Sequence, residues 1–101
     1  MYARVNTFDG STERFEAATD YIRQLVIPAS RQMPGFAGMI SLVDRETGRS
    51  MGITLWESIE ALEMSEEAAT FVRNQTTQSG EATLVSVQRF EVADLTIEPR
   101  P

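Results

Sequence analysis

The chain has 101 residues, enough for one domain around a single hydrophobic core. It contains no histidine and no cysteine, so it cannot supply a disulfide, a thiolate nucleophile, an imidazole base or a histidine ligand for zinc or haem. The formal charge is −6 and all nine basic residues are arginine, so we expect no nucleic-acid binding. No apolar run reaches the roughly 20 residues of a membrane helix, and the N-terminus lacks a signal-peptide pattern. We therefore expect no membrane contact and a cytoplasmic location.

The first third of the sequence predicts a strand followed by a long helix. Residues 2–8 alternate as strands do, and one face carries Tyr2, Arg4, Asn6 and Phe8. Ser11 is placed as a helix N-cap, and apolar residues then recur at helical spacing as far as Met33. Pro28 lies inside this pattern and predicts a kink rather than an end, because proline removes one backbone hydrogen bond. Gly35, after Pro34, marks the stop.

The rest of the chain predicts a hairpin, a second helical region and a last strand. The hairpin strands are residues 36–43 and 51–56, joined by a short polar link. Ser58 and Ser65 are placed as caps in the helical region that follows, and residues 83–93 form the last strand. The first hairpin strand is apolar on both faces, with Phe36, Ile40 and Leu42 expected on one and Met39 and Val43 on the other.

The element order β-α-β-β-α-β predicts an α+β domain of the ferredoxin-like kind. In this fold an antiparallel sheet carries two helices on one face. A sheet whose other face meets water should be polar there, and the apolar hairpin is not, so we expect a homodimer that packs sheet against sheet. A monomer with an exposed apolar patch is the alternative. The domain is expected to cover residues 1–95, with 96–101 as a loose tail.

Three segments on successive elements carry a family resemblance. They are Val5-Asn6-Thr7, Met33-Pro34-Gly35-Phe36-Ala37-Gly38 and Leu55-Trp56-Glu57-Ser58-Ile59-Glu60-Ala61-Leu62. Together they resemble the antibiotic biosynthesis monooxygenase superfamily of dimeric α+β barrels, over essentially the whole chain. That superfamily contains cofactor-independent quinone-forming monooxygenases and haem-degrading enzymes. The resemblance therefore implies the same ferredoxin-like fold and a homodimer.

The resemblance transfers few catalytic residues. Haem-degrading members use an asparagine on the first strand, a tryptophan on the second helical segment and a histidine further along it. Asn6 occupies the first of these places, whereas the tryptophan place falls at or near Ser65 and the histidine place near Asn74. Haem degradation is therefore disfavoured, since this chain has no histidine to bind the iron. Trp56 belongs to the fold-marking motif and is not the catalytic tryptophan.

Asn6 is the candidate catalytic residue. Amides are depleted in strands, so its hydrogen bonds are expected to serve either a substrate oxygen or a contact between helix and sheet. Arg4 shares its face and could bind an anionic or phenolic oxygen, or else form a salt bridge. The remaining candidates could line an aromatic ligand site or simply fill the core, and they are Phe8, Tyr21, Trp56 and Phe71.

No metal and no cofactor are expected. The carboxylates that could suggest a metal are interpreted as solvated, and they are Asp44, Glu46, Glu66 and Glu67. Ser65 is interpreted as a helix cap, since no base could activate it as a nucleophile.

Two functional hypotheses follow. The first is a cofactor-independent monooxygenase-like enzyme that acts on an aromatic or quinol-type small molecule in a pocket between sheet and helices. The second is a non-catalytic member of the same fold that binds a small apolar molecule or only dimerises. An isomerase or decarboxylase would need an acid–base residue, and the sequence offers only tyrosine or carboxylates for that role.

Overall fold

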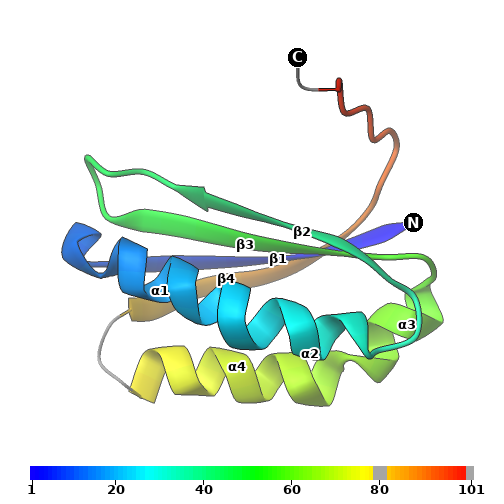
Figure 1. Ribbon diagram of the computed structural model, residues 1–101, viewed down its shortest axis with the longest axis horizontal. Helices are drawn as coiled ribbons and strands as arrows, with labels where there is room; N and C mark the ends of the chain where they lie inside the picture. The colour runs from blue at the N-terminus through cyan, green and yellow to red at the C-terminus, as the bar shows by residue number, and fades with distance from the viewer. Residues whose placement is uncertain (79–81, 100–101) are drawn as a thin grey trace.

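The computed structural model describes residues 1–78 and 82–99. A four-stranded antiparallel sheet has the order β2-β3-β1-β4, and the helices lie on one of its faces (Figure 1). The strands are β1 (Tyr2–Gly10), β2 (Phe36–Val43), β3 (Arg49–Trp56) and β4 (Ala82–Glu91). The helices are α1 (Phe15–Tyr21), α2 (Ile27–Arg31), α3 (Ile59–Met64) and α4 (Glu66–Gln78). This confirms the predicted ferredoxin-like α+β fold.

The predicted first helix is one helical stretch whose hydrogen bonding changes along its length. Ser11 caps a 3₁₀ turn by accepting a hydrogen bond from the Glu13 N–H, and α1 follows. A π-helical turn (Ile22–Val26) joins α1 to α2, in which the N–H of Ile27 bonds to the carbonyl of Ile22, five residues earlier. Pro28 comes next, near the start of α2, where its missing N–H is tolerated. The helix thus continues past this proline, as the spacing predicts, by widening its turn.

The hairpin contains a β-bulge that the alternation of the sequence did not predict. The register between β2 and β3 shifts between Phe36 and Gly38. Phe36 is therefore paired with Trp56 and lies on the helix-facing side of the sheet, and not beside Ile40 as the sequence pattern suggested. Its ring meets the indole of Trp56 edge to face, with 5.4 Å between the ring centroids.

The two longer motifs pack against each other and form the core under the start of the hairpin. Trp56, Ala61 and Leu62 are buried together, with Met33 and Phe36 packed on them. Gly35 has φ +81°, and a Cβ at this position would lie 2.5 Å from the Cβ of Ala61. The carbonyl of Gly35 also accepts a hydrogen bond of 2.8 Å from the N–H of Glu57. These motifs mark the fold because each is the packing surface of the other.

A buried arginine ties the first strand to the helices. Arg4 is 1% exposed, and its Nη2 donates to the Leu62 carbonyl at 2.8 Å, to Ser65 Oγ at 3.0 Å and to Glu66 Oε2 at 2.8 Å. Arg73 donates to the other carboxylate oxygen of Glu66 at 2.7 Å, and Arg89 approaches Oε2 at 3.3 Å. Glu66 is thus a partner for three guanidinium groups, in contrast to the predicted solvated acid.

The other face of the sheet carries no helix. Paired residues on neighbouring strands point to the same side, so Val5, Ile53 and Ile40 form one row across this face. We call it the open face. Leu42 and Phe90 also lie on it, and they are 46% and 49% exposed. The chain after β4 leaves the sheet on this side (Figure 1).

No helix within the described residues is long and apolar enough to cross a membrane.

Leu62 is fully buried, and its truncation tests the core of the two motifs. The Leu62→Ala variant should lose about 2–5 kcal/mol of unfolding free energy, since it removes apolar contacts and leaves a cavity. Met64, two residues on and 75% exposed, is the matched control, and Met64→Ala should change stability by less than about 0.5 kcal/mol. Urea denaturation measures both. Equal losses would contradict the packing described.

Glu66 makes stability depend on pH. Burial alone would raise its pKa, but the hydrogen bond from Arg73 and the charge of Arg4 outweigh this and hold the pKa below the ordinary 4.5. A carboxylate with a depressed pKa stabilises the fold above its unfolded pKa, and this stability is lost as pH falls through the folded pKa. Glu66→Gln should therefore cost about 3 kcal/mol at pH 7, because it leaves Arg4 without its counter-charge, and much less near pH 3.

Denaturant titrations of the wild type and of Glu66→Gln at several pH values test this pH dependence of stability. Asp9→Asn is the control, because Asp9 pairs with Arg49 on the exposed surface, where little stability is gained. A cost of Glu66→Gln that stays constant from pH 7 to pH 3 would show that ionisation of this carboxyl does not stabilise the fold.

Candidate functional site

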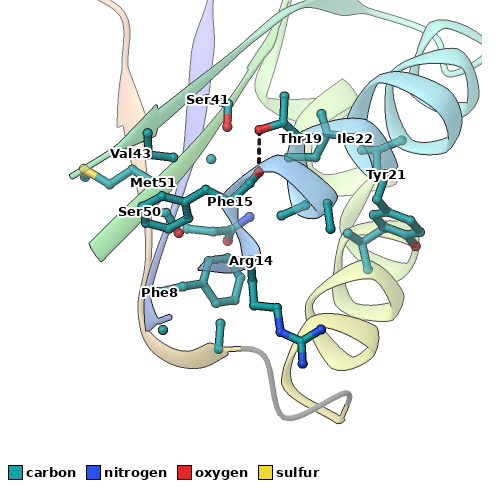
Figure 2. Close-up of a pocket in the computed structure, with 18 of the residues that line it drawn as sticks. Phe8, Arg14, Phe15, Thr19, Tyr21, Ile22, Ser41, Val43, Ser50 and Met51 are labelled. Carbon is teal, nitrogen blue, oxygen red and sulfur yellow. Dashed lines mark hydrogen bonds between the residues drawn. The ribbon is translucent and has the colours of Figure 1, made fainter. Parts of the chain in front are cut away.

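A cavity of about 370 Å³ lies between the sheet and the helices, within the range of small-molecule sites. Figure 2 shows side chains from the strands and from the helices around it, among them Phe8, Phe15 and Tyr21. Its walls are mainly apolar, and further lining residues are Ile22, Val26, Met39, Val43 and Val72. The cavity can thus hold a small, largely apolar ligand.

The cavity exists because small residues form part of its floor. Asn6 of β1 is paired with Gly52 of β3, which is paired with Ser41 of β2, and all three line the cavity. Gly52 has no side chain, and a Cβ there would meet only the Cε of Met39, at 3.9 Å. This row leaves space beside the amide of Asn6 that larger side chains would fill.

The side chain of Asn6 has an unused acceptor. Its Oδ1 is buried and has no hydrogen-bond partner. Such atoms are rare in native proteins, and each calls for a water or ligand to satisfy it. The alternative that the amide serves a contact between helix and sheet does not account for this oxygen.

The structure brings three of the sequence candidates together around the cavity and leaves three outside its lining. Asn6, Phe8 and Tyr21 line it. Arg4 belongs to the network around Glu66, Trp56 is 2% exposed in the core and donates its indole N–H to Thr54 Oγ1 at 3.0 Å, and Phe71 is 62% exposed. The aromatic walls also include Phe15 of α1, which was not among the sequence candidates.

Sequence reasoning also missed the arginines of the site. Arg14 and Arg73 both line the cavity, whereas no aspartate or glutamate is among the residues that do so in the described part of the chain. Arg73 is 9% exposed and its Nη1 is buried without a partner. Nothing in the sequence distinguishes Arg73 from an arginine on the surface of α4, because its neighbour Val72 lies on a different part of the helix.

The places of the haem-degrading residues hold different groups here. Ser65 is 3% exposed, and its hydroxyl donates to the Leu62 carbonyl while it accepts from Arg4. Asn74 is exposed. Within residues 1–78 and 82–99, no group of three or more histidine, cysteine, aspartate or glutamate side chains could hold a metal ion.

Comparisons with known sequences give relatives of undetermined function. No protein-family model matches the chain. An uncharacterised protein of Mycobacterium tuberculosis, Rv2557, is 32% identical over 93 residues, which cover 92% of this chain and 41% of the relative. The chain thus spans about two fifths of the length of the curated relatives it matches.

Solved structures give the fold. A proposed antibiotic biosynthesis monooxygenase from Deinococcus radiodurans superposes with a TM-score of 0.72 and 14% identity, over 99% of this chain and 100% of the other. The haem degrader MhuD from Mycobacterium tuberculosis gives 0.70 and 21%, over 97% and 100%. SnoaB, a cofactor-independent oxygenase from Streptomyces nogalater, gives 0.66 and 19%, over 96% and 97%. The chain therefore has the fold of the antibiotic biosynthesis monooxygenase-like proteins, as its motifs predicted.

Proposed function

We propose that this protein is a cofactor-independent monooxygenase-like enzyme that oxidises an aromatic, quinol-type small molecule in the cavity beside Asn6. The observation that carries the proposal is the unpartnered Oδ1 of Asn6 next to an apolar cavity with aromatic walls. The fold is shared with SnoaB, a cofactor-independent oxygenase, and with the haem degrader MhuD. The absence of histidine from this chain favours cofactor-independent oxygenation over haem degradation.

The reaction in question draws its electrons from the substrate. The deprotonated ring carbon of a quinol or anthrone reduces O₂ and forms a carbon–oxygen bond, and the peroxide anion takes up a proton to give a hydroperoxide on a carbon that still carries a hydrogen. Loss of water from this hydroperoxide leaves a carbonyl, so that one oxygen atom enters the product and the other leaves as water. The protein has to exclude bulk water, orient the ring and stabilise negative charge.

The residues around the cavity suit these tasks. Phe8, Phe15 and Tyr21 provide aromatic surface for a flat ring. Asn6 would hydrogen-bond a ring hydroxyl or the oxygen that becomes charged. Arg4 would act indirectly, because its Nη2 is committed to Leu62, Ser65 and Glu66 and so holds β1 against α3 and α4. Trp56 and Phe71 have no role in this proposal, since neither lines the cavity.

We also propose that the working form is a homodimer through the open face. Ile40, Leu42 and Phe90 are 38%, 46% and 49% exposed there, and large apolar patches of this kind favour association. A second copy of the same face would cover it with complementary apolar surface. The resemblance to dimeric α+β barrels gives the same expectation.

The role of Asn6 is tested by oxygen uptake. The purified protein should consume oxygen with a member of a hydroquinone and anthrone panel, and Asn6→Ala should reduce kcat/KM by about 100-fold, as loss of one stabilising hydrogen bond does elsewhere. Gln24→Ala is the control, since it removes an exposed amide away from the cavity lining and should leave the rate unchanged. Turnover at the buffer rate with every panel member would contradict the proposal.

A cavity-filling variant separates the cavity from the amide. In Gly52→Val the added side chain occupies the space beside Asn6, and a β-branched residue is well tolerated in a strand. Oxygen uptake should fall while the circular dichroism spectrum stays that of the wild type. Undiminished uptake in a folded Gly52→Val protein would place the reaction elsewhere.

The dimer is tested by a charge on the open face. Leu42→Asp should give a monomer, because two buried carboxylates would face an apolar surface. Leu25→Asp is the matched control, as Leu25 is a 59% exposed leucine of the helical layer, and it should leave the dimer intact. Sedimentation equilibrium measures the mass. A wild-type monomer at tens of micromolar would contradict the dimer.

A further inference from the structure

The charge around the cavity has the opposite sign to the charge of the chain. The sequence carries 15 acidic and nine basic residues, for a net charge of −6. Two arginines, Arg14 and Arg73, line the cavity, and no carboxylate from the described residues does. A random sample of this chain's charged side chains would contain more acids than bases. The charged side chains that the described residues bring to the cavity lining are thus both basic.

The neighbouring network adds to this positive charge. Arg4, Arg73 and Arg89 all contact Glu66, so one carboxylate meets three guanidinium groups. Arg73 belongs both to the network around Glu66 and to the cavity lining, because its Nη2 donates to Glu66 and its side chain also lines the cavity. The surplus charge lies in a part-buried region where water screens it poorly.

Unused hydrogen-bonding groups lie in the same region. Among the described residues, the buried side-chain atoms without a partner are Arg4 Nε, Asn6 Oδ1 and Arg73 Nη1. Arg73 and Asn6 both line the cavity, and Arg4 is two residues before Asn6 on the same strand face. These atoms offer two donors from cations and one acceptor. A ligand in the cavity with a charged oxygen and a hydroxyl would pair with Arg73 Nη1 and Asn6 Oδ1, whereas a hydrocarbon would leave both unpaired; Arg4 lies outside the lining.

We infer that the cavity binds an acidic aromatic, whose carboxylate or phenolate oxygen pairs with Arg73 while the ring lies against Phe8 and Phe15. This inference rests on the proposed function for the reaction and adds the charge class of the substrate. Arg73 is then a binding residue that selects an anion over its neutral analogue. Its guanidinium is anchored by Glu66 and Thr70, so little conformational freedom is lost when the anion binds.

The test compares two ligands of the same shape, 2-naphthoate and 2-naphthamide, by isothermal titration calorimetry at pH 7.5. The wild type should bind the anion at least about tenfold more tightly, since charge-assisted hydrogen bonds exceed neutral ones. Arg73→Gln should bring the two affinities to within about twofold of each other. Arg89→Gln is the control, because Arg89 also contacts Glu66 but does not line the cavity, and this variant should lower the preference much less than Arg73→Gln does.

Arg73→Lys guards against a variant that fails to fold, since it retains the charge and should keep a reduced preference for the anion. Titration of Gly52→Val shows where the ligand binds, because a side chain that fills the cavity should abolish binding of 2-naphthoate. Equal affinity of the wild type for both ligands, binding of neither at millimolar concentration, or a preference that persists in folded Arg73→Gln would each overturn the inference.

The outcomes are separable from those of the proposed reaction. Selective binding of 2-naphthoate without any oxygen uptake would support the preference for an anion and contradict only the proposed oxygenase reaction. Turnover of a neutral anthrone without any preference between the naphthalene ligands would support the oxygenase reaction and contradict only the inferred anion site.

Discussion

The burial of the Arg4 guanidinium is the constraint on which the rest of the structure depends. A charge that is 1% exposed needs partners, because desolvation disfavours it, and for the same reason burial lowers the pKa of Arg4. Its partners come from one short region, the carbonyl of Leu62, the hydroxyl of Ser65 and the carboxylate of Glu66. Meeting that need fixes the end of α3 and the start of α4 over β1. The position of α4 fixes Arg73, and the position of β1 fixes Asn6.

The cavity lies where this packing between sheet and helices is incomplete. At the Arg4 end of the sheet, Trp56, Ala61 and Leu62 fill the space under the helices. One row further along, Asn6, Gly52 and Ser41 face the helices with small side chains, and the space stays open. Packing density therefore falls within a few residues of the same strands, from a closed core to a ligand-sized cavity. A stable end and an open end on one sheet let the fold retain its stability while Asn6 keeps an unsatisfied oxygen.

The sequence predicted the elements better than it predicted the site, for physical reasons. Hydrophobic periodicity and caps report local structure, so the strands, the caps at Ser11 and Ser58 and the helix past Pro28 followed from them. The bulge after Phe36 could not, because the register shift depends on how β2 pairs with β3 and leaves no mark in the alternation of the sequence. The places of Arg4, Phe71 and Arg73 could not be predicted either, since only tertiary packing decides which of them lines the cavity.

The lack of a base in the site is consistent with the positive charge there. The chain has no histidine or cysteine, and no carboxylate among the described residues lines the cavity, so no such side chain can take a proton from a bound ring. A guanidinium beside an acidic hydroxyl or ring C–H lowers the pKa of that group by favouring its anion. In the proposed reaction a single water molecule would then accept the proton, while Arg73 and Asn6 would stabilise the resulting negative charge. The charge of the arginine would thereby favour the deprotonation that other sites obtain from a base. The same charge that selects an anionic ligand would stabilise the ring anion that reacts with oxygen.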